Sequence, residues 1–184
     1  YTTLFRSVGR SQGQFEDGPG ELSDATIALD WLQNMNPDAK QCWIAGYSFG
    51  AWIGLQLLMR RPDINNFIAV SPPANEKDFS FLAPCPASGL IIQGGKDEIV
   101  NPYQVESMAH KLNQQRNVDI DFALIEDGDH MYNNHLGDLY KVSGQYVISA
   151  LQRRSPLKKR RGRRKKSELD DDLLLEGPED EEIL

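Results

Sequence analysis

The sequence GYSFG at residues 46–50 places a serine between two glycines, where its hydroxyl could act as a nucleophile. It follows an apolar run, Cys42–Ala45, that predicts a strand, and it precedes Ala51–Arg60, which predicts a helix. A strand, a tight turn and a helix are the context of a nucleophile elbow, in which the glycines relieve crowding and the serine is exposed. The bare pattern also fits an ordinary Gly/Ser turn, but the flanking elements favour Ser48 as a nucleophile. The N–H of Phe49, at the start of the helix, would then donate to a developing oxyanion.

An activated serine needs a general base, and the base needs an acid that orients it. Asp97 follows the apolar run Leu90–Ile92, and His130 follows the run Ile120–Ile125. Both runs predict strands, and the carboxyl ends of parallel strands meet at one edge of a sheet. The predicted catalytic residues are therefore Ser48 as nucleophile, Asp97 as orienting acid and His130 as general base.

Three other side chains could take the roles of base or acid. His110 falls within a predicted helix, which favours an exposed position away from the strand ends. His135 lies shortly after His130 and is the weaker alternative for the base. Glu98 adjoins Asp97, and its side chain is expected to point elsewhere.

Asp127 and Asp129 flank the predicted base. Aspartate side chains often bind nearby backbone N–H groups in turns, so these two are predicted to form the loop. Together with His130 and His135 they could instead bind a metal ion, but their spacing matches no recognised ligand pattern. Neither a metal nor an organic cofactor is expected.

Short apolar runs alternate with runs of helical spacing, which is typical of an α/β fold around a mostly parallel sheet. The predicted strands are residues 41–45, 67–70, 90–92 and 120–125. The predicted helices are residues 23–35, 50–61, 102–115 and 139–153, the first with Ser23 or Asp24 as its N-cap. The sequence contains no internal repeat.

These residues, in this order, resemble the α/β-hydrolase superfamily. Within it, the chain is similar to small cap-less hydrolases grouped with dienelactone hydrolases and with serine aminopeptidase or Xaa-Pro dipeptidyl-peptidase-like domains. The segments Phe5–Gly13 and Gly20–Asp24 resemble the loop after the family's fourth strand and the start of its next helix. The resemblance covers residues 4 to 152 and implies a three-layer α/β fold. Dienelactone hydrolases proper use a cysteine nucleophile, from which Ser48 departs.

The resemblance also implies parts that this sequence lacks. In the family, three further strands precede the region that Tyr1–Phe5 resembles. The loop after the third of these strands carries a second oxyanion donor. We therefore expect a hydrolase domain that lacks the first strands, as in a fragment, a processed form or a broken gene product. Removing one oxyanion donor typically lowers turnover by about 10²–10³, which predicts a weakly active or inactive chain.

No large lid is expected over the site. Only Ser71–Ser88 separates two predicted strands at the point where many hydrolases of this fold insert a helical cap. Tyr47 and Phe81 are the predicted substrate contacts, although Phe81 lies in an aromatic run that also fits ordinary packing. An open cleft suits small esters, thioesters or extended peptides.

Charge divides the 184 residues, which hold 20 basic and 27 acidic side chains for a net charge of -7. Residues 1–152, with 10 basic and 18 acidic side chains, form the predicted hydrolase-like domain. Residues 153–184 form a predicted disordered tail, with a basic block at 153–166 and an acidic block at 167–184. The run Lys158–Lys166 could bind nucleic acid, but it lacks interleaved aromatic residues, so a solvated and self-neutralising tail is favoured.

The remaining composition narrows the class of protein. No apolar run approaches the roughly 20 residues of a membrane span, and two cysteines cannot form a disulfide framework, so a cytoplasmic location is expected. The sequence predicts a serine hydrolase of esters, thioesters or peptide-like amides that acts through an acyl-enzyme. The alternative is an inactive hydrolase-like scaffold whose charged tail binds a partner or nucleic acid. The expected partner is a small-molecule ester or peptide substrate, with no membrane, and a homo-oligomer is left open.

Overall fold

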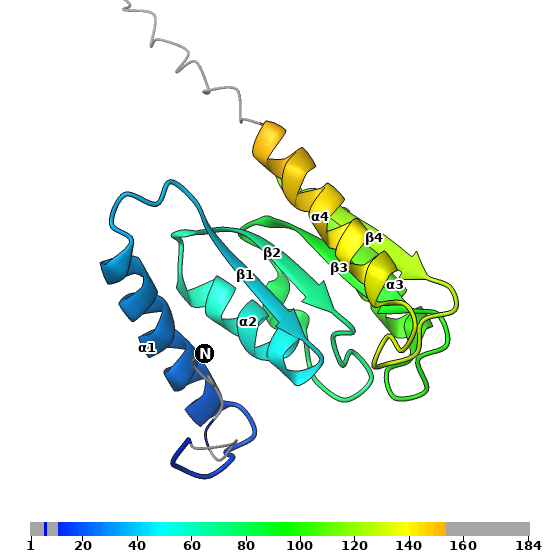
Figure 1. The fold of residues 1–184 in the computed structure, drawn as a ribbon, viewed down its shortest axis with the longest axis horizontal. Coiled ribbons are helices and arrows are strands. Elements are labelled where there is room, and N and C mark those ends of the chain that lie inside the picture. Colours follow the sequence, from blue (N-terminus) through cyan, green and yellow to red (C-terminus); the bar gives the residue numbers. More distant parts are fainter. Residues whose placement is uncertain (1–5, 7–10, 154–184) are drawn as a thin grey trace, which may run out of the picture.

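The computed structural model describes residue 6 and residues 11–153 of the chain (Figure 1). Its strands are β1 (Cys42–Tyr47), β2 (Ile64–Val70), β3 (Ser88–Gly94) and β4 (Ile120–Ile125). Its helices are α1 (Pro19–Met35), α2 (Phe49–Arg60), α3 (Pro102–Asn113) and α4 (Leu136–Gln152), with a short 3-10 turn, η1 (Ser80–Leu82). All the strand pairs are parallel, in the order β1-β2-β3-β4, which confirms the predicted α/β class.

Helices cover both faces of the sheet and give the predicted three layers (Figure 1). Successive side chains of a strand point to opposite faces, so neighbouring residues enter different clusters. Phe67 and Ile91 pack with α2 and α3 in the larger cluster, which also takes Leu29 of α1. Leu90 and Ile92 pack with Tyr146 of α4 in the smaller cluster on the other face. Burial of these apolar side chains is the main force that holds the layers together.

The strand register brings the four carboxyl ends to one edge of the sheet. Tyr47 pairs with Val70, which in turn pairs with Ile92, and Gly94 pairs with Ile125. The loops that follow these strands therefore begin side by side. Each of the three predicted catalytic residues lies in one of these loops.

The predicted N-cap of the first helix was wrong. Helix α1 begins at Pro19, because proline is well suited to a first helical turn and the Glu21 carboxylate accepts the N–H of Gly18 at 2.8 Å. Ser23 is exposed within the helix, and Asp24 instead accepts two hydrogen bonds from Arg6 at 2.9 and 3.0 Å. The prediction took the first polar residues before the apolar run as the cap and missed the Pro-Gly-Glu signal.

The observed bounds of other strands and helices also differ from the predicted ones, mostly where polar residues extend an element. Strand β2 begins before the predicted Phe67, because Asn66 pairs with Trp43 and with Ser88. Strand β3 continues past Ile92 through Gln93 and Gly94, and α4 begins earlier than the predicted residue 139. A search for apolar runs cannot detect these extensions.

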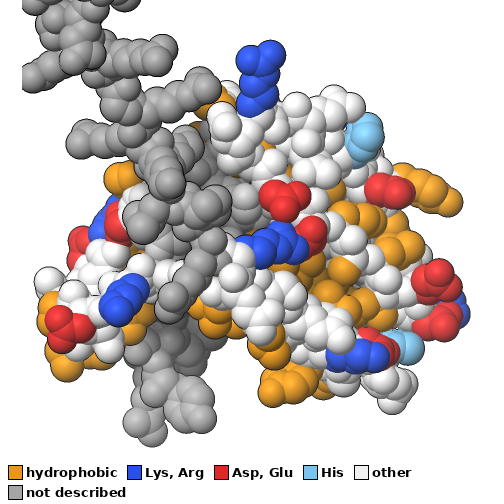
Figure 2. Space-filling view, turned by 90° about the horizontal axis from the view of Figure 1, so that it is seen from above, with side chains coloured by type: hydrophobic (Ala, Val, Ile, Leu, Met, Phe, Trp, Pro, Cys, Tyr) orange, Lys and Arg blue, Asp and Glu red, His pale blue; other side chains and the backbone are white. Residues whose placement is uncertain are grey.

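Several surfaces of the described part remain apolar. On α1, Leu29 is buried, whereas Ile27, Trp31 and Leu32 are more than half exposed. Figure 2 shows hydrophobic side chains among charged ones on one face of the molecule. No helix within the described residues is both long and apolar enough to cross a membrane. The segment at residues 1–5, most of the loop at 5–13 and the charged tail from residue 154 lie outside the described residues.

Candidate active site

The turn between β1 and α2 has the conformation of a nucleophile elbow. Ser48 has φ 52° and ψ -122°, a region that side-chain-bearing residues rarely occupy. Its N–H donates to the carbonyl of Val70 at 2.8 Å, which ties the turn to the end of β2. A Cβ atom at Gly46 would lie 2.3 Å from the carbonyl oxygen of Gly50, so the strand and helix can approach this closely only with glycine at position 46.

Replacing Gly46 by alanine is expected to lower the free energy of unfolding by about 1–3 kcal/mol, because the new methyl group meets backbone that cannot rotate away. Urea unfolding followed by circular dichroism measures the change. Gly144→Ala on α4 is the matched control, since a Cβ there would meet nothing within 4 Å. That control should be neutral or stabilising by up to about 1 kcal/mol, and a similar loss in both variants would contradict the crowding argument.

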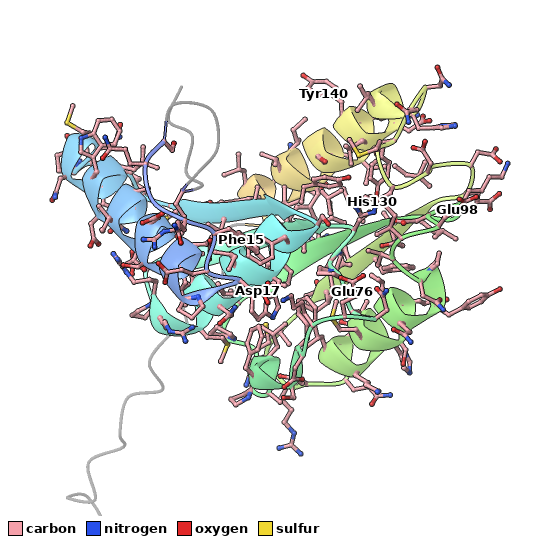
Figure 3. The ribbon with its side chains drawn as sticks, turned by 90° about the horizontal axis from the view of Figure 1, so that it is seen from below. Phe15, Asp17, Glu76, Glu98, His130 and Tyr140 are labelled. Carbon is pink, nitrogen blue, oxygen red and sulfur yellow. The ribbon has the colours of Figure 1, made fainter. Side chains whose placement is uncertain are left out.

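The three predicted catalytic side chains lie in one hydrogen-bonded row. Nε2 of His130 lies 3.2 Å from Oγ of Ser48, and Nδ1 of His130 lies 2.8 Å from Oδ2 of Asp97. A carboxylate only accepts hydrogen bonds, so Nδ1 carries the proton and Nε2 is left to accept from the serine hydroxyl. In Figure 3, His130 lies near the ends of the strands, and Glu98 lies to its right.

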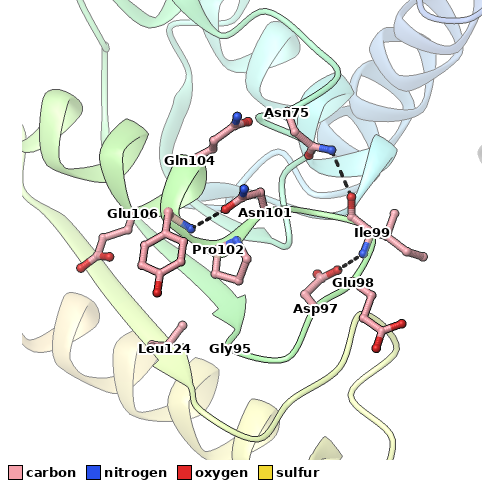
Figure 4. A pocket seen from close by; sticks show the side chains of 11 residues that line it. Asn75, Gly95, Asp97, Glu98, Ile99, Asn101, Pro102, Gln104, Glu106 and Leu124 are labelled. Carbon is pink, nitrogen blue, oxygen red and sulfur yellow. Dashed lines mark hydrogen bonds between the residues drawn. The ribbon is translucent and has the colours of Figure 1, made fainter.

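The Asp97 carboxylate is buried and fully paired. Its side chain has no exposed surface. Oδ1 accepts the N–H group of Ile99 at 2.9 Å (Figure 4) and that of Val100 at 2.8 Å. Oδ2 also accepts from Gln93 at 3.0 Å. Burial alone would raise the pKa of Asp97, but the hydrogen bonds from Val100, His130, Gln93 and Ile99 outweigh it and hold that pKa below its usual value. The carboxylate is therefore ionised at neutral pH.

Two tyrosines hold the loop that carries His130. The hydroxyl of Tyr47 donates to the carbonyl oxygen of His130 at 2.9 Å, and the centres of their rings are 5.2 Å apart. The hydroxyl of Tyr132 lies 2.8 Å from Oγ of Ser71, at the end of β2, and both side chains are buried. Burial raises the pKa of Tyr132 to about 12, so this contact stays neutral. Tyr47, predicted to contact the substrate, thus contacts His130, the predicted base, and its role toward substrate stays a prediction.

Sequence reasoning missed three buried polar residues of the site, Ser71, Gln93 and Tyr132. Ser71 and Tyr132 are far apart in the sequence, and nothing in their local pattern indicates that they meet. Gln93 did carry a signal, because it is a polar residue that continues the run Leu90–Ile92 directly before the loop of Asp97.

The alternative bases and acid lie apart from this row. His110 is exposed on α3 and contacts Gln114, whereas Nδ1 of His135 lies 3.1 Å from Asp138. Glu98 is exposed beside the buried Asp97.

The aspartates around His130 bind neighbouring groups in the loops. Asp127 pairs with Lys96 at 2.6 Å, and Asp129 accepts the backbone N–H of Asn133 at 2.8 Å. No three His, Cys, Asp or Glu side chains gather into a metal-ligand cluster within residue 6 and residues 11–153.

The residues predicted to bind the oxyanion and the substrate lie in different surroundings. Phe49 is the first residue of α2, where backbone N–H groups have no acceptor within the helix. Its ring packs between Phe15 and Trp52, with ring centres 5.3 and 5.8 Å away. Phe81 packs against the larger core cluster and stacks on Phe79 at 6.0 Å, so its assignment to the substrate stays a prediction.

The crossover from β2 to β3 forms no lid. Residues 71–87 contain one short helical turn, η1, and no longer helix. A cavity of about 570 Å³ lies beside the loop of Asp97, lined among others by Asn75, Asp97 and Tyr103 (Figure 4). It lies on the side of Asp97 toward α3.

Comparison with known proteins places this chain in a family. The sequence model of the dienelactone hydrolase family matches residues 13–154. Uncharacterized protein RP471 from Rickettsia prowazekii is 49% identical over 156 residues, which are 81% of this chain and 66% of that protein.

Solved structures show the same fold. ATU1826, a protein of unknown function from Agrobacterium tumefaciens, is 49% identical with a TM-score of 0.78, over 80% of this chain and 68% of that one. XC6422 from Xanthomonas campestris, an α/β serine hydrolase without lid, is 33% identical with a TM-score of 0.69, over 79% of this chain and 64% of that one. The chain thus spans about two thirds of the length of these relatives. Because the family match covers most of its residues, the chain belongs to the dienelactone hydrolase family within the α/β hydrolases.

Proposed function

We propose that the chain is a serine hydrolase in which Ser48, His130 and Asp97 form the catalytic triad. The observation that carries this proposal is the unbroken row of contacts from Oγ of Ser48 through the imidazole to the buried carboxylate. The strained backbone of Ser48 supports it, because such strain is common at functional sites and has no evident structural use here. The family match supports hydrolysis as the class of reaction.

The geometry suits a two-step transfer of an acyl group. Oγ of Ser48 attacks the carbonyl carbon while Nε2 of His130 takes the hydroxyl proton, and the Phe49 N–H stabilises the oxyanion. The intermediate expels the leaving alcohol or amine, which receives that proton from His130. Water then repeats the sequence on the acyl-enzyme and releases the acid and Ser48. Asp97 keeps its charge throughout and stabilises the imidazolium.

Labelling by a fluorophosphonate probe tests the nucleophile. Attack by Ser48 would form an O–P bond and expel fluoride. Mass spectrometry should therefore show one label on the full chain and, after digestion, locate it on the peptide that contains residue 48. Ser48→Ala should remove the label. Ser23→Ala is the matched control, because Ser23 is exposed within α1 and takes no part in the row of contacts from Ser48 to Asp97, and it should keep the label. Absence of labelling in the parent chain would favour the inactive scaffold.

Short acyl esters are the proposed substrates. The short crossover at residues 71–87 offers no cap that could enclose a long chain, and long acyl chains gain little where apolar surface stays in water. We therefore expect kcat/KM for p-nitrophenyl esters to be highest for acetate and butyrate and to fall for longer chains. Equal values from acetate to dodecanoate would contradict the open site.

A further inference from the structure

Gln93 occupies a position where the sheet would ordinarily hold an apolar side chain. It lies on β3 two residues after Ile91, so both side chains face the cluster beneath α3. Gln93 has no exposed surface, and strand β3 is otherwise buried and largely apolar. A buried amide at such a place costs free energy unless both its ends are hydrogen-bonded.

One end of the Gln93 amide is not hydrogen-bonded. Its Nε2 donates to Oδ2 of Asp97 at 3.0 Å, with longer contacts to the carbonyls of Gly94 and Val100 at 3.2 and 3.4 Å. Its Oε1 is buried and has no partner within the described residues. The reverse orientation of the amide would set Oε1 against a carboxylate, which is repulsive, so the donor must face Asp97. The site therefore tolerates an unpaired acceptor in order to keep one donor on Asp97.

That donor acts on the same oxygen that accepts the hydrogen bond from Nδ1 of His130. Oδ2 of Asp97 accepts from both Gln93 and Nδ1 of His130, whereas Oδ1 is held by two backbone N–H groups. Removing Gln93 would leave His130 as the one remaining side-chain partner of Oδ2 within the described residues, so the carboxylate could bind His130 at a different angle. We propose that Gln93 is a positioning residue, which fixes the Asp97 carboxylate so that His130 faces Ser48; this inference rests on the proposed function.

Gln93→Leu tests the role, because leucine fills the apolar surroundings and removes the unpaired acceptor together with the donor. Loss of the unpaired acceptor and loss of the donor to Asp97 act on stability in opposite directions, so the midpoint of thermal unfolding should change little. The kcat for p-nitrophenyl acetate should fall about 10- to 100-fold with KM unchanged. Gln56→Leu on α2 is the matched control, since Gln56 also carries a buried and unpaired amide atom, its Nε2. That control should keep the parent kcat. An equal fall in kcat for both variants would overturn the proposal.

Gln93→Glu provides a second variant that does not rely on an apolar replacement. The introduced carboxyl can donate its O–H to Asp97 only while it is neutral, and ionisation beside Asp97 replaces that donor by repulsion. The activity relative to the parent chain should therefore fall as pH rises. Among the described residues, His130, Tyr132 and Tyr47 are titratable groups that interact with Asp97, and both tyrosines have raised pKa values and stay neutral. A constant activity ratio across pH would contradict the donor role.

A spectroscopic readout separates this inference from the proposed function. The Nδ1 proton of His130, held against a buried carboxylate, should give a low-field proton resonance in substrate-free protein. Gln93→Leu should shift or broaden it, and Gln56→Leu should not. If Gln93→Leu shifts the resonance but the parent chain is neither labelled by the probe nor able to hydrolyse esters, the proposed function is refuted while the positioning contact is supported. Ester hydrolysis with an unchanged resonance and an unchanged kcat in Gln93→Leu would refute the role of Gln93 alone.

Discussion

Replacing His130 by alanine is expected to lower kcat for p-nitrophenyl acetate by up to about 10⁶. The imidazole is the sole side chain within hydrogen-bond reach of Oγ of Ser48 in the described residues, at 3.2 Å, so its loss leaves the hydroxyl without a proton acceptor. Steady-state kinetics measures the change, and circular dichroism checks that the variant is folded. Labelling of Ser48 by the fluorophosphonate probe should slow in parallel.

His135→Ala is the matched control for this substitution. His135 lies in the same loop region but contacts Asp138 at 3.1 Å, away from the serine. Its removal should leave kcat and the labelling rate unchanged. A large loss with His135→Ala and a small one with His130→Ala would reverse the assignment of the base.

The order of elements and the place of the site could be predicted because both depend on local patterns. The apolar run 120–125 matches β4, and the strand before residues 46–50 and the helix after them are β1 and α2. Parallel strands then force the residues at their carboxyl ends together, which is how Ser48 and His130 meet although they are distant in the sequence. No feature of one loop alone would reveal that contact.

The contacts that tune the site could not be predicted, because they depend on packing between distant segments. The bond between Ser71 and Tyr132 joins two loops whose sequences show no complementary pattern. Of the four hydrogen bonds to Asp97, the one from His130 joins distant loops. The other three depend on the path of a loop that begins at Gly94 and Gly95, and the local sequence leaves that path undetermined. The cap of α1 was predicted wrongly for a related reason, since Asp24 has a tertiary partner, Arg6, that outweighs its local preference.

Asp97→Asn is expected to lower kcat for p-nitrophenyl acetate by about 10⁴, with little change in the fold. An asparagine amide in place of the carboxylate either presents an N–H to Nδ1 of His130 and imposes the wrong tautomer, or fails to stabilise the imidazolium. Steady-state kinetics measures the loss. Glu98→Gln is the matched control, because Glu98 is adjacent but exposed, and it should keep the parent kcat.

Asp97→Asn should also change how the free energy of unfolding depends on pH. Hydrogen bonds hold the pKa of Asp97 below its usual value in the folded chain, whereas an unfolded chain has the ordinary value of about 3.9. The unfolded state therefore binds the proton first as the pH falls, and the ionised Asp97 stabilises the fold above pH of about 4. This contribution is lost as the pH falls through the folded pKa, and asparagine lacks it at every pH.

The difference in the free energy of unfolding between the parent chain and Asp97→Asn should accordingly be constant near neutrality and shrink below pH of about 4. Urea unfolding at a series of pH values measures it, and Glu98→Gln, at an exposed carboxyl, should show no comparable trend. A difference that grows on acidification would mean that burial, which favours the neutral acid, outweighs the hydrogen bonds to Asp97. In that case the carboxyl would be protonated more easily than a free aspartate, and the charged partner of His130 would be lost at a higher pH than in an unfolded chain.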